Sequence, residues 1–74
     1  MNFDKELDAR GLACPMPIVK TKKSLVDMRP GQVLKVVATD VGSLADMKAF
    51  AETTGHELLS AETSGREYVF FLKK

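Results

Sequence analysis

Residues 33–39 read VLKVVAT, and this stretch decides the fold that the sequence predicts. It is rich in β-branched residues, which favour an extended strand. Its side chains are apolar on nearly both faces of that strand, with Lys35 as the exception. A run of this kind is typical of a strand in the interior of a sheet. We therefore expect residues 33–39 to form a central strand.

Two elements are expected before this strand. The stretch KELDARGLA, residues 5–13, alternates charged side chains with apolar ones, which predicts a short strand that ends at Gly11. Residues 15–28 have apolar or small side chains at three- and four-residue spacing, which predicts a helix with one buried stripe. The members of this stripe are Ile18, Thr21, Leu25 and Met28. Pro30 and Gly31 then end the helix and turn the chain.

A second helix is expected after the central strand. Ser43, with Asp46 three residues later, resembles a capping box in which Asp replaces the usual Glu or Gln. The helix that starts there has a buried stripe of Leu44, Met47, Phe50, Ala51 and Thr54. Gly55 follows at the place of a left-handed C-terminal cap. Asp40 and Asp46 are thus most simply a turn residue and a cap residue.

The C-terminal part predicts a hairpin. Residues 57–63 and 67–73 form its two strands, and Ser64 with Gly65 forms its turn. The resulting order is βαβαββ, and two helices can cover only one face of a four-stranded sheet. We therefore expect an α+β fold, a two-layer sandwich with a mixed sheet and both helices on one face, and a single domain over residues 1–74.

Composition excludes several classes of function. The 74 residues contain 11 Lys and Arg against 10 Asp and Glu, so no overall charge favours nucleic acid or an anionic membrane. The absence of Trp and the single Tyr leave few stacking platforms for nucleic acid. One Cys and one His are too few for a structural zinc site. The N-terminal stretch MNFDKELD is no signal peptide, and no stretch is long enough to span a membrane. We expect a cytoplasmic monomer without a cofactor.

The only cysteine lies between two of the three prolines, in the stretch ACPMP at residues 13–17. A residue before proline is kept out of the helical region, so Cys14 is expected to be the N-cap of the first helix, with Pro15 at N1 and Pro17 at N3. The helix dipole and the Met16 N–H would then lower the pKa of the thiol. A lone cysteine is often a buried structural thiol, but these flanking prolines favour an exposed and reactive one.

The surroundings of Cys14 offer candidate contacts for a partner protein. Basic residues flank it in sequence, namely Arg10, Lys20, Lys22 and Lys23, although lysines on a helix also form an ordinary solvated face. Asp40 is expected at the same end of the sheet as Cys14, because both follow the carboxyl ends of strands. No His or carboxylate can be assigned as a general base for the thiol, and His56 is expected to have a structural role at the end of the second helix.

These residues carry a resemblance to the TusA/SirA family of small sulfur-relay proteins, whose hallmark is a Cys-Pro-x-Pro motif at the start of the first helix. The motif stands here as LDARGLACPMP at residues 7–17, and the similarity continues through Pro30-Gly31, the stretch TDVGS at 39–43 and GHEL at 55–58. The resemblance covers essentially the whole chain and implies the same βαβαββ sandwich.

The resemblance also implies a function. Cys14 would take sulfane sulfur from a rhodanese or a cysteine desulfurase, hold it as a persulfide and pass it to a cysteine of an acceptor protein, while Pro15 and Pro17 shape its loop. Such carriers serve tRNA thiolation, molybdenum-cofactor formation or sulfur oxidation, and they are sulfurtransferase-type carriers rather than stand-alone catalysts. Met16 stands where the tRNA-thiolation type has an acid, which favours a carrier of sulfur metabolism and makes Met16 a candidate partner contact.

Two other functions are consistent with the sequence. The small size and local basic face also suit a non-covalent regulatory or protein-interaction module. An exposed cysteine with thiolate character also suits a one-cysteine redox sensor, which peroxide would oxidise to the sulfenic acid. The fate of Cys14 in the presence of a sulfur donor distinguishes the carrier from both.

Overall fold

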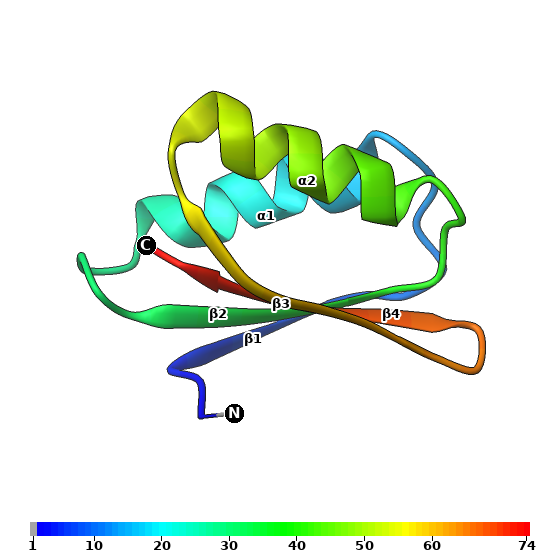
Figure 1. The fold of residues 1–74 in the computed structure, drawn as a ribbon, viewed down its shortest axis with the longest axis horizontal. Helices are drawn as coiled ribbons and strands as arrows, with labels where there is room; N and C mark the ends of the chain where they lie inside the picture. Colours follow the sequence, from blue (N-terminus) through cyan, green and yellow to red (C-terminus); the bar gives the residue numbers. More distant parts are fainter. Residues whose placement is uncertain (1) are drawn as a thin grey trace.

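The computed structural model describes residues 2–74 and contains four strands and two helices (Figure 1). In chain order the elements are β1 Lys5–Ala9, α1 Met16–Val26, β2 Val33–Ala38, α2 Ser43–Thr54, β3 Glu57–Ser64 and β4 Glu67–Lys73. The predicted βαβαββ order and the α+β fold class are therefore confirmed. Neither helix of the described part of the chain is long and apolar enough to cross a membrane.

The four strands form one mixed sheet in the order β1-β2-β4-β3, so β2 is an interior strand as predicted. β1 pairs with β2 in parallel, whereas β2 with β4 and β4 with β3 are antiparallel pairs. Both helices lie on one side of this sheet, and no helix of residues 2–74 covers the other side (Figure 1). The two crossover connections, β1-α1-β2 and β2-α2-β3, place them there.

The core lies between the sheet and the two helices. Side chains alternate along β2, so Leu34, Val36 and Ala38 face the helices and all three are 0% exposed. β4 adds Phe70 and Leu72, and the helices contribute the rest of the buried cluster, which includes Leu25, Met47, Phe50 and Ala51. This burial of apolar surface is the main stabilising contribution to the fold.

Part of the helix-free face of the sheet is also buried, which accounts for the apolar residues on both sides of β2. Val37 and Phe71 point to this face yet are each only 8% exposed. Phe3, before β1, covers part of it: its ring lies 6.3 Å from that of Phe71, and the Lys35 ammonium lies 5.2 Å from the centroid of the Phe3 ring. A cation over an aromatic face is a favourable electrostatic contact.

Both helix starts differ from the prediction. α1 begins at Met16, with Pro15 as its N-cap at φ −97° and ψ 14°, one residue later than expected. α2 has Gly42 as its N-cap, Ser43 is already helical, and no side chain caps the helix. The expected Ser43–Asp46 capping box is therefore wrong. The reason lies in Asp40, whose carboxylate accepts the Gly42 N–H at 3.1 Å and turns the chain before Ser43 is reached.

The other predicted boundaries differ by a residue or two. Gly55 ends α2 in the left-handed conformation, with φ +79°, as predicted. α1 ends at Val26, and Met28 is buried beyond it. In the hairpin Ser64 still pairs with Glu67, so the turn falls at residues 65–66 rather than at Ser64 and Gly65.

Two valines test the core directly. Val36→Ala should lower the free energy of unfolding by roughly 2–3 kcal/mol, because it removes buried methyl groups and leaves a cavity. Val26→Ala makes the same change at a helix position that is 69% exposed, where the gain in helix propensity keeps the effect within about 0.5 kcal/mol. Urea denaturation of the two variants measures both values. Equal losses would contradict the assignment of the core.

Candidate functional site

The parallel pairing of β1 with β2 brings two loops together. The carboxyl ends of parallel neighbours meet at the same edge of a sheet, so the loops that lead into α1 and α2 start side by side. The Gly11 N–H donates to the Thr39 hydroxyl at 2.9 Å and links the loops directly. The first loop carries Cys14 and the second carries Asp40, so the expectation that these two residues share one end of the sheet is confirmed.

The chain around Cys14 turns tightly before α1. The Cys14–Pro15 peptide bond is cis. The Met16 N–H donates to the Ala13 carbonyl at 2.9 Å, and the Pro15 carbonyl accepts the first helical bonds, from Ile18 and Val19. Cys14 thus precedes the N-cap, and the Met16 N–H that was expected to contact the sulfur is already bonded elsewhere. The prediction that Cys14 is the N-cap is wrong, because a compact turn consumes that donor.

The two prolines have different places in this turn. Pro15 is exposed and is the N-cap, whereas Pro17 is buried at the second helical position rather than at N3. An N–H is not needed at either position, because the first helical N–H groups have no partner within the helix. The Pro17 carbonyl accepts the buried Thr21 hydroxyl at 2.7 Å, which fixes the first turn of α1.

The thiol of Cys14 faces α2. Cys14 is exposed, and its Sγ donates to Oδ2 of Asp46 at 2.6 Å. Asp46 is half-buried in the first turn of α2 and belongs to the helix that follows the neighbouring strand. The sequence-based interpretation of Asp46 as a cap missed this contact. The signal that could have found it is the parallel pairing itself, which was used to place Asp40 at this end of the sheet and applies equally to the first turn of α2.

This carboxylate changes the expected acidity of the thiol. Its hydrogen bond, some desolvation and the negative charges of Asp46 and Asp40 raise the pKa of Cys14 above its ordinary value. Ionisation of the thiol would put two negative charges in contact, which favours the neutral form. The prediction of a lowered pKa is therefore wrong: the sulfur lies ahead of the helix and beside an acid instead of receiving a backbone N–H.

A groove between the two helices starts at Cys14 and has a volume of about 500 Å³. Its lining is mainly apolar, although Lys22 and Asp46 add one charge of each sign. The lining residues from the α1 side are Cys14, Pro15, Ile18, Val19 and Lys22, and those from α2 are Asp46, Ala49, Phe50, Thr53 and Thr54. The groove therefore offers an apolar surface directly beside the thiol.

The predicted contact residues divide into two groups. Lys22 lines the groove, and Met16, 41% exposed, follows Pro15 at the start of α1. Lys20 and Lys23 are exposed on α1 but do not line the groove. Asp40 is half-buried beside the thiol, where its charge acts on Cys14. The structure thus places Asp40 beside the thiol and Lys22 in the groove that starts at it.

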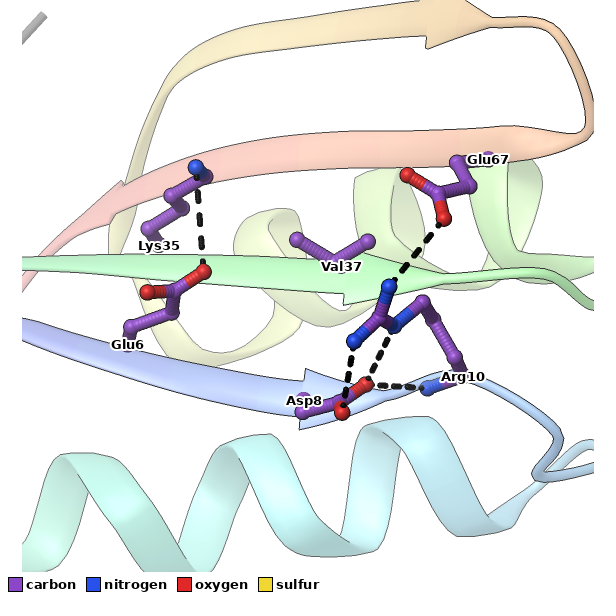
Figure 2. Close-up of a pocket in the computed structure, with 6 residues that line it drawn as sticks. All are labelled: Glu6, Asp8, Arg10, Lys35, Val37 and Glu67. Atoms are coloured by element: carbon purple, nitrogen blue, oxygen red, sulfur yellow. Dashed lines mark hydrogen bonds and ion pairs between the residues drawn. The ribbon is translucent and has the colours of Figure 1, made fainter.

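Arg10 does not join this site. Figure 2 shows it on the sheet, where its guanidinium bonds to Asp8 at 2.9 Å and to Glu67 at 3.4 Å beside Val37. The hydrogen bonds from Arg10 lower the pKa of the Asp8 carboxyl to about 2. Lys35 and Glu6 form a second pair at 3.7 Å across the same shallow hollow. The opposite charges within these ion pairs offset one another. Arg10 therefore does not add positive charge near the thiol, contrary to the expectation from the sequence.

His56, which follows the end of α2, packs against an aromatic residue of that helix. The His56 ring stacks on Phe50 with centroids 6.1 Å apart, as a structural role requires. Within residues 2–74 no group of three or more His, Cys, Asp or Glu side chains could hold a metal ion.

Comparison with known proteins identifies relatives of the whole chain. Residues 5–74 match the family described as "Sulfurtransferase TusA". The sulfur carrier protein TusA of Allochromatium vinosum is 52% identical over 73 residues, which cover 99% of this chain and 96% of that protein. YrkF of Bacillus subtilis, described as a candidate sulfur carrier, is 57% identical over 68 residues, but this chain spans only 37% of its length.

A solved structure confirms the fold. The SirA-like protein of Desulfitobacterium hafniense superposes with a TM-score of 0.82 over 95% of this chain and 96% of that one. The two sequences are 24% identical, so this likeness concerns the fold alone.

Proposed function

Because this chain belongs to the TusA family of sulfurtransferases, we propose that Cys14 takes sulfane sulfur from a donor protein, holds it as a persulfide and hands it to a cysteine of an acceptor protein. The donor is a rhodanese or a cysteine desulfurase, and the relay operates in the cytoplasm. Met16, in place of an acid, favours a carrier of sulfur metabolism. The observation that carries the proposal is the position of the only cysteine, exposed at the head of an apolar groove.

The groove supports a carrier more than a self-sufficient enzyme. A thiol that accepts sulfur from another protein must be reached by a cysteine on that protein, and an open groove beside Cys14 allows such an approach. A partner segment that lies along Val19 and Phe50 would bury apolar surface and hold its sulfur near Cys14. The proposed occupant of the groove is thus the cysteine-bearing segment of the donor or the acceptor.

The two alternatives make different demands on Cys14. A redox sensor reacts with peroxide in proportion to its thiolate fraction, and the raised pKa of Cys14 keeps that fraction small at neutral pH. A non-covalent interaction module does not need the sulfur at all. It would keep its partner function after Cys14→Ser.

Intact mass tests sulfur loading. Reduced protein treated with polysulfide, or with cysteine and a cysteine desulfurase, should gain one sulfur atom that dithiothreitol removes. Cys14→Ser removes the nucleophile and should gain none. A wild-type protein that stays unmodified with every donor would contradict the proposal, as would an equal gain in the variant.

Two exposed valines of α1 test the groove as the docking site. Val19→Asp places a charge among the groove residues and should slow loading from the desulfurase about tenfold or more, because that charge loses its water when the partner binds. Loading from polysulfide, which needs no docking, should stay within about twofold of the wild-type rate.

Val26→Asp is the matched control, since Val26 is on the same helix, 69% exposed and outside the groove. Its rates with both donors should equal those of the wild-type protein. Slowing of both variants alike would show that the groove does not receive the donor.

A further inference from the structure

We infer that Asp46 sets the protonation state of Cys14 during sulfur transfer: it holds the thiol of the empty carrier protonated and tethered to α2, and it releases the side chain once sulfur is attached. This inference rests on the proposed function, because it concerns the same thiol. It assigns to α2 a positioning residue that acts on the nucleophile of the loop before α1.

The geometry of the pair supports this role. The 2.6 Å separation of Sγ and Oδ2 is short for a hydrogen bond between a thiol and an oxygen. This hydrogen bond joins two residues that are 32 positions apart in sequence. Asp46 forms no ion pair within residues 2–74, so no cation there neutralises its charge. Its carboxylate therefore acts on the thiol, which is its hydrogen-bonded partner.

The charged groups around the thiol come from three elements. Asp46 belongs to α2, Asp40 lies in the turn after β2, and Lys22 of α1 lines the same groove. The two acids act on Cys14 in the same direction and raise the pKa of its thiol. The hydrogen bond to Asp46 is the largest of these influences. Removal of Asp46 should therefore change the acidity more than any other single substitution.

The sulfur-transfer step shows why protonation matters. The Cys14 thiol first loses its proton, and the thiolate then attacks the outer sulfur of the donor persulfide. A new S–S bond forms on Cys14 while the S–S bond of the donor breaks, and the donor cysteine leaves as a thiolate that takes up one proton. The sulfane sulfur changes carriers without net oxidation. The thiolate fraction of Cys14, which Asp46 keeps low, therefore limits this step.

Attachment of sulfur to Cys14 then removes the hydrogen bond to Asp46. Once Sγ carries a sulfur atom in place of hydrogen, it has no proton to donate to Asp46. The carboxylate would also repel a persulfide anion beside it, which favours a side chain turned away from α2. The empty and loaded carriers thus differ in the contact between the Cys14 loop and α2. That contact gives a partner protein a structural difference to recognise.

The test measures thiol reactivity against pH without any sulfur donor. Asp46→Asn keeps the size of the side chain but removes its charge, so the pKa of Cys14 should fall and the curve of iodoacetamide alkylation rate against pH should move to lower pH. Below that pKa, each tenfold gain in thiolate should speed alkylation about threefold, because nucleophilicity falls as the pKa falls. The rate of loading from polysulfide should follow the same displacement.

Glu52→Gln is the matched control, because Glu52 is an exposed acid of the same helix and does not line the groove. Its alkylation curve should superimpose on that of the wild-type protein. Asp46→Ala is a second variant, which keeps the test possible if Asp46→Asn folds poorly. It also removes the charge and should displace the alkylation curve to lower pH. Circular dichroism confirms folding before each series.

The outcomes separate this inference from the proposed function. Alkylation curves of both Asp46 variants that coincide with the wild-type curve would overturn the role of Asp46, while sulfur loading of the wild-type protein would still support the carrier. Failure of the wild-type protein to load would overturn the carrier function and the transfer role of Asp46 with it. Displacement of the alkylation and polysulfide-loading curves of the Asp46 variants to lower pH would support the inference.

Discussion

The parallel pairing of β1 with β2 is the constraint on which the rest of this structure depends. Two parallel neighbours need a crossover connection, which here contains α1, and α1 lies on the same face of the sheet as α2. The same pairing brings the loops before the two helices to one edge, where the Gly11 N–H bonds to Thr39. The groove, the thiol and the carboxylate beside it all follow from that arrangement.

The site combines an accessible sulfur with a neighbour that restrains it. Cys14 is exposed, as the proposed transfer to another protein requires, yet Asp46 and Asp40 favour its protonated form. A carrier that waits between donor and acceptor benefits from this balance, since a protonated thiol is oxidised slowly.

Sequence patterns predicted the fold well because each element has a strong local signal. The apolar run of β2, the stripe of α1 and the left-handed Gly55 all correspond to features that depend on neighbouring residues alone. The site was harder to predict, since its properties depend on a contact across 32 residues. Capping rules consider only residues close in sequence, so they predicted Asp46 as a cap residue of its own helix and could not show that it faces Cys14. The Met16 N–H was likewise assigned to the sulfur, because the turn that binds it to Ala13 has no equally clear sequence signal.

The proposed function requires that Cys14 hold sulfur in a form that it can give away, and cyanide tests this most directly because it takes up sulfane sulfur as thiocyanate. Protein loaded with isotope-labelled polysulfide and freed of excess reagent should release one labelled thiocyanate per chain, and the mass of the reduced protein should return. Cys14→Ser should release none. A wild-type protein that gains mass but yields no labelled thiocyanate would contradict the account, because its sulfur would then be bound without being transferable.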